Sequence, residues 1–592
     1  MNELIVSRLA GLRREMEKSG VRAWYVSGTD PHQSEYLPQY WQARKYLTGF
    51  TGSAGQVVVT ATRAALWTDS RYFLQAEEQL AGTGIQLMKL RIAGTPTPAE
   101  WLGAVLEPSA LVGTDACCMS VNQYKTFQAD LQKCHLQLSD TGDLLASCWT
   151  ERQPLPSIPI FEHELPFAGK CRQEKFQQVR DELRECRADG LLITALDDLA
   201  WVLNLRGQDV DFNPVFVGYG MITPEEALLF VDPVKVPEAL STKLASDSVR
   251  MLPYLAVFEV LRAFRGTLLV DPDRTNQALL GCLNPDVEVQ FQLSVPARLK
   301  ALKSETELKY IRETMRKDGV AMVEFLFWLD QAIGKETVTE YDIALKLSSF
   351  RSLQEGYRGD SFFPIVGYNE NGAIVHRSVT RETASELKPD GMLLFDSGGQ
   401  YVTGTTDITR TISLSEPTNQ QRFDFTIVLK GMINLTLAKF PAGTKGCNLD
   451  VLARFFMWQN GMNYGHGTCH GIGYFLNVHE GPMSIRQEYN EYSIEPGMVL
   501  SNEPAFYREG KYGLRTENMM VCVPREITDF GTFYGFETLT LCPLDLKLID
   551  VDLLTETEIE WINAYHQWCF DELSPLLEPD KQAFLKRLTT SL

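Results

Sequence analysis

The chain has 592 residues, of which 44% are hydrophobic and 22% charged, and its formal net charge is −20. This length accommodates about three to four domains with cores of their own, and the composition is that of an ordinary soluble globular protein. Affinity for nucleic acid depends on clustered Lys and Arg, so the acidic balance excludes a nucleic-acid partner. No run approaches the roughly eighteen apolar residues of a membrane span, which argues against a membrane protein.

The cysteines also indicate the compartment. Twelve of them are scattered along the chain, with one adjacent pair at Cys117 and Cys118 and no CxxC motif. In a chain of this length the pattern favours reduced thiols over a disulfide framework. The first sixteen residues form an amphipathic helix pattern without the apolar core of a secretory signal. We therefore expect a cytoplasmic protein.

The first half of the chain contains the same series of predicted elements twice. Each copy has a helix, an apolar strand, a further stretch and then a pair of strands, which predicts a tandem duplication of an α/β unit. The Pro-rich segment 153–159 marks the join. The predicted elements are helices at 9–18 and 173–187, strands at 21–27, 56–60, 64–69, 190–194, 215–219 and 227–232, and a helix-like Trp/Leu stretch at 199–207.

The second half has a different pattern. Ser304 and Glu307 form a capping box that begins a long helix towards residue 329. Beyond Gly391 apolar and polar residues alternate, which predicts an α+β domain with antiparallel hairpins rather than a doubly wound sheet. The further elements are strands at 391–396 and 407–414 and helices at 423–437, 450–458 and 557–573.

The most informative stretch is His466-Gly-Thr-Cys-His470, followed by Gly471-Ile-Gly473 and Val478-His479-Glu480. It places three of the eight histidines within fourteen residues. The glycines predict a loop or irregular turn rather than a helix, and they let backbone approach a metal or substrate closely. The apolar run 474–478 is a candidate strand. A single histidine in such a run is more often structural, but three clustered with glycines favour a functional site.

Four carboxylates flank this stretch. Asp396 and Asp407 lie upstream, at the end and start of two alternating runs joined by a Gly-rich turn, so a hairpin would bring them side by side. Two such carboxylates raise each other's pKa, and a cation between them resolves the conflict. Glu503 and Glu517 lie downstream. Four carboxylates with one histidine are an oxygen-rich ligand set that suits two divalent ions.

Three of the four carboxylates also have a plainer interpretation. Asp is a common turn residue, so Asp396 and Asp407 taken alone could merely cap strands. Glu517 and Arg515 would share one face of a strand by the period of two, so Glu517 could serve only as the ion-pair partner of Arg515. His376, after a short apolar run, is the weakest of these residues taken singly.

Together these residues resemble the metal-dependent, pita-bread-fold peptidases, the family that contains methionine aminopeptidase, prolidase and aminopeptidase P. The resemblance covers nearly the whole chain and is greatest to the large three-domain cytosolic Xaa-Pro aminopeptidases. The motifs that carry it are Asp30-Pro-His-Gln-Ser-Glu-Tyr, Gly49-Phe-Thr-Gly-Ser-Ala-Gly, Trp67-Thr-Asp-Ser-Arg-Tyr-Phe-Leu-Gln-Ala, Asp396-Ser-Gly-Gly-Gln-Tyr, Gly404-Thr-Thr-Asp-Ile-Thr-Arg-Thr, the stretch from His466 through His479-Glu-Gly-Pro, and Trp561-Ile-Asn-Ala-Tyr-His.

The resemblance implies the domain organisation. It predicts two tandem creatinase-like α/β domains at 1–152 and 153–304, a pita-bread catalytic domain at 305–545 and a helical C-terminal extension at 546–592. It also implies a homodimer and peptide substrates with proline at the second position.

The resemblance further implies the roles of the site residues. Two divalent ions, typically Mn²⁺, would be held by five ligands, and a hydroxide bridging them would attack the carbonyl of the first residue in an Xaa-Pro peptide. Glu503 is the candidate for proton transfer, and His376 and His479 would stabilise the oxyanion and hold the peptide. The implied metal ligands are Asp396, Asp407, His470, Glu503 and Glu517. The implied catalytic and substrate-contacting residues are Arg71, His376, His466, His470, His479 and Arg515.

Two departures and three alternatives qualify this hypothesis. Cys469 stands where the family often has Gly or Ser, and Asn502 where Asp is frequent, but neither change removes a ligand. Prolidase uses the same five ligands, although the nine-residue step from His470 to His479 and the duplicated first half fit the three-domain aminopeptidases better. A non-catalytic binding module on this fold, and a creatinase-like hydrolase without metals, would lack the ligand set that is intact here.

Overall fold

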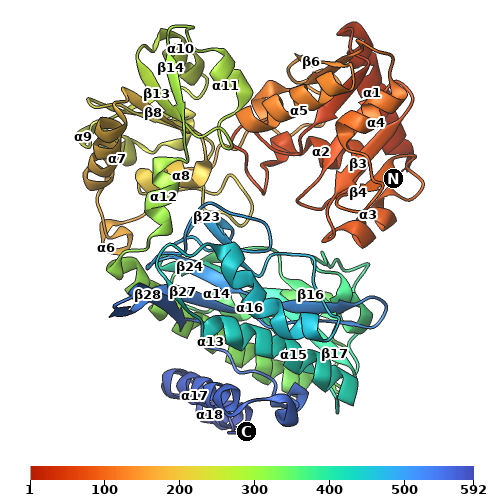
Figure 1. The fold of residues 1–592 in the computed structure, drawn as a ribbon, viewed down its shortest axis with the longest axis vertical. Coiled ribbons are helices and arrows are strands. Elements are labelled where there is room, and N and C mark those ends of the chain that lie inside the picture. Colours follow the sequence, from red (N-terminus) through yellow and green to blue (C-terminus); the bar gives the residue numbers. More distant parts are fainter. Residues whose placement is uncertain (1) are drawn as a thin grey trace. The chain divides into compact units, whose positions relative to one another are not determined.

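The computed structural model describes residues 2–592, which fold into two compact units (Figure 1). Unit 1 contains the residues up to Leu165 together with Lys170–Ala297, and unit 2 contains Pro166–Gly169 and Arg298–Leu592. None of the helices within residues 2–592 is long and apolar enough to cross a membrane.

Unit 1 holds two six-stranded sheets with the same topology, in the orders β4-β3-β2-β1-β5-β6 and β12-β11-β10-β8-β13-β14. In the first sheet β1 pairs antiparallel with β2 and parallel with β5. In the second sheet β8 likewise pairs antiparallel with β10 and parallel with β13. The tandem duplication is therefore confirmed. The strands are β1 Ala23–Val26, β2 Gln56–Thr60, β3 Ala64–Thr68, β4 Gln86–Lys89, β5 Leu111–Thr114 and β6 Gln137–Asp140, then β8 Gly190–Ile193, β10 Tyr219–Ile222, β11 Ala227–Phe230, β12 Val249–Leu252, β13 Thr267–Val270 and β14 Glu288–Phe291.

Helices cover these sheets, and a short pair, β7 (Phe161–Glu162) and β9 (Leu205–Arg206), lies beside the second. The helices are α1 Asn2–Lys18, α2 Ala43–Thr48, α3 Phe73–Leu80, α4 Pro98–Val105, α5 Val121–Lys133, α7 Arg172–Cys186, α8 Leu196–Val202, α9 Glu238–Ser246, α10 Ala256–Ala263 and α11 Gln277–Gly281. The short helices α6 (Leu165–Ala168) and α12 (Val295–Ala301) lie where the chain passes between units.

One predicted strand of unit 1, at 215–219, is wrong. Val215 and Val217 are buried as expected, but their backbone groups do not join a sheet. The carboxylate of Asp209 accepts the N–H of Val217 at 2.6 Å, and the N–H of Asp209 bonds to the carbonyl of Val215. A side chain thus takes the place of a neighbouring strand, and the strand β10 begins only at Tyr219.

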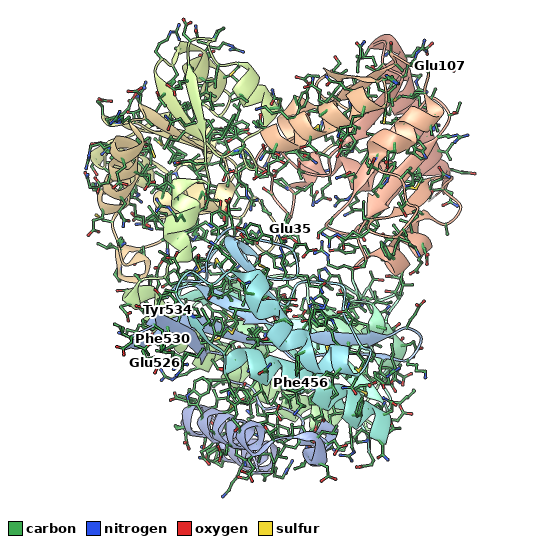
Figure 2. The ribbon with its side chains drawn as sticks, viewed as in Figure 1. Glu35, Glu107, Phe456, Glu526, Phe530 and Tyr534 are labelled. Carbon is green, nitrogen blue, oxygen red and sulfur yellow. The ribbon has the colours of Figure 1, made fainter. Side chains whose placement is uncertain are left out.

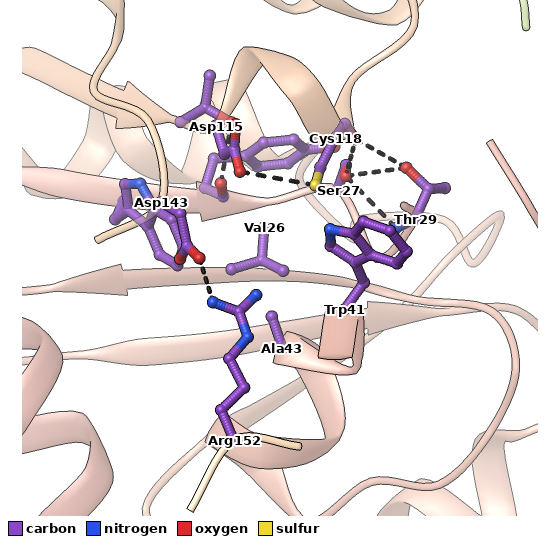
Figure 3. Close-up of a pocket in the computed structure, with 12 residues that line it drawn as sticks. Val26, Ser27, Thr29, Trp41, Ala43, Asp115, Cys118, Asp143 and Arg152 are labelled. Atoms are coloured by element: carbon purple, nitrogen blue, oxygen red, sulfur yellow. Dashed lines mark hydrogen bonds and ion pairs between the residues drawn. The ribbon is translucent and has the colours of Figure 1, made fainter. Parts of the chain in front are cut away.

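A small pocket lies at the carboxyl ends of the parallel strands β1 and β5 (Figure 3). In α/β sheets this edge often holds a ligand. Here the polar groups bond to one another: the hydroxyls of Ser27 and Thr29 both donate to the Cys118 carbonyl, and Arg152 pairs with Asp143. The pocket contains none of the predicted site residues.

Unit 2 is built on antiparallel sheets, as the alternation predicts. The principal sheets have the orders β16-β17-β20 and β21-β28-β27-β24-β22-β23, and smaller ones are β15-β18-β19 and β25-β26. The strands are β15 Tyr357–Asp360, β16 Ile365–Tyr368, β17 Met392–Ser397, β18 Gly399–Tyr401, β19 Gly404–Thr405, β20 Ile408–Ser413, β21 Lys439–Pro441, β22 Cys469–Gly471, β23 Glu480–Ile485, β24 Val499–Asn502, β25 Ala505–Arg508, β26 Tyr512–Arg515, β27 Asn518–Thr528 and β28 Gly531–Thr538.

The helices of unit 2 also agree with the sequence. The predicted capping box is present at Ser304 and Glu307, where helix α13 (Glu305–Ala332) begins. The others are α14 Glu340–Ser352, α15 Asn419–Thr436, α16 Gly446–Gln459, α17 Glu556–Leu573 and α18 Pro579–Leu588. Helices α17 and α18 (dark blue in Figure 1) contribute Ile562 and Leu585 to the same apolar core as α13. The hairpin of β27 and β28 ends in an exposed turn at Phe530 (Figure 2).

Candidate metal centre

Asp396 lies in β17 of the sheet β16-β17-β20, and Asp407 directly precedes its strand β20. Strands β17 and β20 are antiparallel, and Asp396 lies opposite Thr409. Asp407 precedes Thr409 by two positions, so its side chain follows the same face and is a diagonal neighbour of Asp396. The predicted hairpin is confirmed, with β18 and β19 forming a smaller hairpin inside its connection. Asp396 lies within a strand, so it is not a turn residue.

The other three predicted ligands lie in or beside strands of the six-stranded sheet of unit 2, β21-β28-β27-β24-β22-β23. His470 lies in β22, Glu503 directly follows β24, and Glu517 directly precedes β27. The pair Asn502 and Asn518 is in register between β24 and β27, so the two glutamates that flank it leave the sheet at the same end. The positions of Glu503 and Glu517 are therefore set by strand ends, and that of His470 by the strand β22 itself.

Three local predictions need correction here. His470 belongs to a short strand and not a loop. The run 474–478 is a turn rather than a strand: Phe475 has a φ of +48°, and the N–H of Gly473 bonds to the carbonyl of Asn477. Arg515 ends β26, whereas Glu517 stands between two strands, so the two do not share a strand face.

The functional groups converge. His470 Nε2 lies 3.3 Å from Asp407 Oδ2 and 3.5 Å from Glu503 Oε1. Asp407, His470 and Glu517 each offer a ligand atom, and these atoms lie within 4.8 Å of one another. Asp396 lies in the same electrostatic cluster, since its charge raises the pKa of Glu517.

Burial makes this cluster costly without a cation. It raises the pKa of Glu503 to about 7 and the pKa of Glu517 well above its usual range, and in both groups neighbouring carboxylates raise the pKa further. The pKa of Asp407 is also raised, first by burial, with His470 acting in the opposite direction. Several buried carboxylates that cannot all ionise together are the environment that a divalent cation relieves.

Two further details fit a metal. Asp396 Oδ1 is buried without a hydrogen-bond partner, so this oxygen is available to bind a cation. His470 Nδ1 lies 2.9 Å from the carbonyl of Gly471, which must accept, so Nδ1 carries the proton. Nε2 then faces the carboxylate oxygens of Asp407 and Glu503, an arrangement that suits a metal between them.

Arg515 does not pair with Glu517. Its guanidinium donates to Asp396 Oδ2 at 2.7 Å, to the Tyr507 hydroxyl at 2.6 Å and to Thr409 Oγ1 at 3.1 Å. The Thr409 hydroxyl in turn donates to Glu517 at 2.8 Å. Arg515 thus leaves one oxygen of Asp396 for another partner while holding the other.

Tyr507 is a site residue that the sequence analysis missed. Its hydroxyl also lies 2.9 Å from His466 Nε2, and burial raises its pKa to about 12, so it stays protonated. Its place depends on the pairing of β25 with the strand that carries Arg515, so the sequence alone holds no signal for it.

The other predicted site residues are His479, His376 and Arg71, and they lie outside the cluster of carboxylates. His479 packs edge-on against His470, with ring centroids 4.4 Å apart. His376 is half-buried in the connection between β16 and β17. Arg71 belongs to unit 1, where it forms a two-point ion pair with Asp69 at 2.8 Å. The contacts of these residues with a peptide stay a prediction.

The two positions that differ from the family pattern, Cys469 and Asn502, do not disturb the cluster of predicted ligands. Cys469 alternates with His470 along β22, and its side chain is buried in an apolar cluster instead of the carboxylate face. Asn502 donates to the Met432 carbonyl and the Thr436 hydroxyl of α15, so it anchors the end of β24.

A buried ion pair between Asp318 and Arg351 holds the backbone next to Asp396 and Asp407. Asp318 on α13 accepts hydrogen bonds from Arg351 at 2.8 Å and from the hydroxyl of Thr406 at 2.9 Å. Arg351 also donates to the Ser397 carbonyl. Ser397 and Thr406 adjoin Asp396 and Asp407, so this pair fixes the backbone on which the two carboxylates stand.

Comparison with known proteins agrees with this arrangement. Residues 309–524 match the metallopeptidase family M24, residues 8–148 and 151–307 each match the creatinase/prolidase N-terminal domain, and residues 532–592 match the C-terminal region of M24 peptidases. A "Probable Xaa-Pro aminopeptidase P" of Laccaria bicolor is 38% identical over 97% of this chain and 91% of its own. "Aminopeptidase P2" of Arabidopsis thaliana is 37% identical, over 97% of this chain and 87% of its own.

A solved structure is similar over the whole length. The X-prolyl aminopeptidase of Caenorhabditis elegans, described as "a cytosolic enzyme with a di-nuclear active site", superposes with a TM-score of 0.95. It is 32% identical and the match covers 99% of this chain and 100% of that one. Fold and site together define a metal-dependent peptidase with a pita-bread catalytic domain. The chain belongs to metallopeptidase family M24, so the resemblance inferred from its motifs is confirmed.

Proposed function

We propose that this chain removes the N-terminal residue from peptides that carry proline at the second position, using two divalent metal ions. The observation that carries the proposal is the convergence of Asp407, His470 and Glu517 beside a carboxylate, Asp396, whose Oδ1 has no partner. The full-length likeness to Xaa-Pro aminopeptidases supports the substrate class.

The donor set indicates which ions fit. We propose Asp396, Asp407, His470, Glu503 and Glu517 as ligands, a hard set with one imidazole that suits Mn²⁺. When bound, the two ions supply positive charge that polarises the scissile carbonyl and lowers the pKa of water.

The protein's own groups would then divide the remaining tasks. Glu503, at the edge of the cluster and 3.9 Å from His466 Nδ1, holds and transfers the proton. His376 and His479 donate hydrogen bonds to the carbonyl oxygen as it becomes an oxyanion. Arg515 and Tyr507 keep Asp396 and His466 in orientation through the contacts described above. Arg71 would contact the peptide.

The proline requirement has a physical basis. The Xaa-Pro bond is a tertiary amide without an N–H, so a peptidase that relies on that donor loses a contact. A site shaped for the proline ring converts this loss into selectivity. Prolidase is the alternative with the same ligand set, and it would cleave dipeptides alone. The relatives that match the full chain are aminopeptidases, which favours the tripeptide activity.

We expect EDTA-stripped protein to be inactive on Arg-Pro-Pro and to release free arginine once Mn²⁺ is added, because metal charge drives the attack. The measurement is arginine release with Mn²⁺, Co²⁺ and Zn²⁺ compared at equal concentration. Arg-Ala-Pro serves as the matched substrate that lacks proline at the second position. Cleavage of the dipeptide Arg-Pro without cleavage of Arg-Pro-Pro would identify a prolidase instead.

We further propose a cytoplasmic homodimer with domains at 1–152, 153–304, 305–545 and 546–592. The reduced state of the cysteines and the description of the Caenorhabditis elegans enzyme as cytosolic support the compartment. Val451, Phe455 and Trp458 support the dimer, since all three are at least 40% exposed along one stripe of α16. The neighbouring Phe456 faces elsewhere, with Lys430 Nζ 4.7 Å from its ring (Figure 2).

If this stripe joins two copies, Phe455→Glu should convert the dimer to a monomer by burying a charge in the interface. Sedimentation velocity over a range of concentrations measures this. Leu353→Glu is the control, because Leu353 is 76% exposed outside the stripe and should leave the mass unchanged. A dimer that survives Phe455→Glu would place the contact on another surface.

A further inference from the structure

The connection between β16 and β17, residues 369–391, is long and nearly free of regular structure. Within it the structure has one short 3₁₀ helix, η4 (Asn369–Ala373), and an isolated bridge between Glu386 and Thr339. Long connections of this kind are usually functional, and they need anchors to hold one conformation. This one carries His376, the proposed oxyanion donor.

A single carboxylate, that of Glu340, anchors the connection. Its side chain is fully buried at the start of α14 and accepts four hydrogen bonds. All four donors belong to the stretch from the end of β16 to the end of the connection. They are the N–H of Tyr368 (2.8 Å), Asn371 Nδ2 (2.9 Å), the Arg377 guanidinium (2.9 Å) and the N–H of Ser385 (2.9 Å).

These bonds leave little freedom near His376. Arg377, its chain neighbour, also donates to the Thr383 carbonyl at 2.7 Å, and the N–H of Glu340 donates to the Ser385 carbonyl. Val379 is buried in the main core of unit 2. An ion pair at Arg377 and an apolar anchor at Val379 therefore both lie within the three residues that follow His376.

The connection also lies against the candidate site. A Cβ atom added to Gly513 would meet the carbonyl oxygen of Gly372 at 1.7 Å, so the two backbones touch. Gly513 belongs to β26, the strand that ends in Arg515. Backbone contact with this strand fixes one side of the connection, and Glu340 fixes the other.

We propose that Glu340 is a positioning residue for the reaction: its carboxylate holds residues 369–391 so that His376 faces the scissile carbonyl. The inference rests on the proposed function, because it assigns Glu340 a role through His376. Only a carboxylate suits all four donors, since it accepts at both oxygens. The isosteric amide of Gln would direct its own NH₂ group against two of these donors, which would then lose their acceptor.

The test is Glu340→Gln, with Arg377→Ala as a second, milder variant should the first fail to fold. We expect kcat/KM on Arg-Pro-Pro to fall by about 10- to 100-fold, because a displacement of about 1 Å has an effect of this size. Amide hydrogen exchange in residues 369–391 should accelerate while exchange in β17 and β20 stays slow. Glu558→Gln is the matched control. Glu558 lies on α17, and its buried carboxylate accepts hydrogen bonds from Lys430 and from the N–H of Thr555. It should leave exchange in the connection and kcat/KM as in the wild type.

A double-mutant cycle separates positioning from general stability. If Glu340 acts through His376, then Glu340→Gln should have almost no further effect on kcat/KM in a His376→Ala background. Equal losses in both backgrounds, or unchanged exchange in residues 369–391, would overturn the inference. The exchange measurement needs no substrate, so an anchored connection in a protein without Xaa-Pro activity would contradict the proposed function alone.

Discussion

Asp407→Ala should lower kcat on Arg-Pro-Pro by about 10³-fold or more, which corresponds to about 4 kcal/mol of activation free energy. Asp407 is 5% exposed and its Oδ2 lies 3.3 Å from His470 Nε2, so its loss opens the centre of the cluster. Alanine removes a proposed ligand and leaves His470 without the neighbour that orders it. We expect the metal content, measured by inductively coupled plasma mass spectrometry, to fall together with kcat.

The matched control is Asp545→Ala. Asp545 is a half-buried aspartate whose Oδ2 accepts the N–H of Ser413 in β20 at 2.8 Å, at the opposite end of the strand from Asp407. It should lower the melting temperature while leaving metal content and kcat close to those of the wild type. Near-normal activity of Asp407→Ala at full metal content would reject the ligand assignment.

Much of the architecture could be predicted from the sequence, because it is encoded in local patterns. The capping box at Ser304 begins α13 where predicted, and the two alternating runs around Asp396 and Asp407 form paired strands. The duplicated unit was visible since both copies need the same buried strands in the same order. These features depend on periodicity, which a single sequence displays.

The misses have a different origin, namely contacts between residues far apart in the chain. The 215–219 strand failed because the side chain of Asp209 captures a backbone N–H. The ion pair considered between Arg515 and Glu517 does not form, because a strand ends between the two residues. Arg515 instead donates to Asp396, which is 119 residues earlier in the chain. Tyr507 carries no motif of its own and acquires its place only when β25 pairs with β26. Sequence spacing cannot display partners that tertiary structure supplies.

The metal-free protein should become less stable as the pH rises from about 4.5 to about 7. The folded-state pKa of Glu503 is raised from 4.5 to about 7, so the folded state binds more protons than the unfolded state in this window. Stability is then fully present below the unfolded pKa and is lost as the pH rises through the folded one. A shift of this size in one carboxyl group corresponds to about 3 kcal/mol. Glu517 and Asp407, whose pKa values are also raised, act in the same direction.

Bound metal should remove this pH dependence, because it is held by the ionised carboxylates. The increase in melting temperature on adding Mn²⁺ to EDTA-stripped protein should therefore be larger at pH 8 than at pH 5.5. Titration calorimetry at pH 6 in buffers of different ionisation enthalpy should detect proton release on binding. An Mn²⁺ effect that is equal at both pH values would contradict this account.

Asp407→Asn provides the sharper form of the same test. Removal of one buried charge lowers the pKa of Glu503 towards its usual range, since the charge of Asp407 contributes to raising it. At pH 8 and without metal, the variant should melt at a higher temperature than the wild type, although it is inactive and gains little from Mn²⁺. Asp271→Asn replaces a buried aspartate of unit 1 whose pKa is raised by burial, and it should keep the full response to Mn²⁺. A metal-free Asp407→Asn protein less stable than the wild type at pH 8 would mean that repulsion within the cluster is not what the metal relieves.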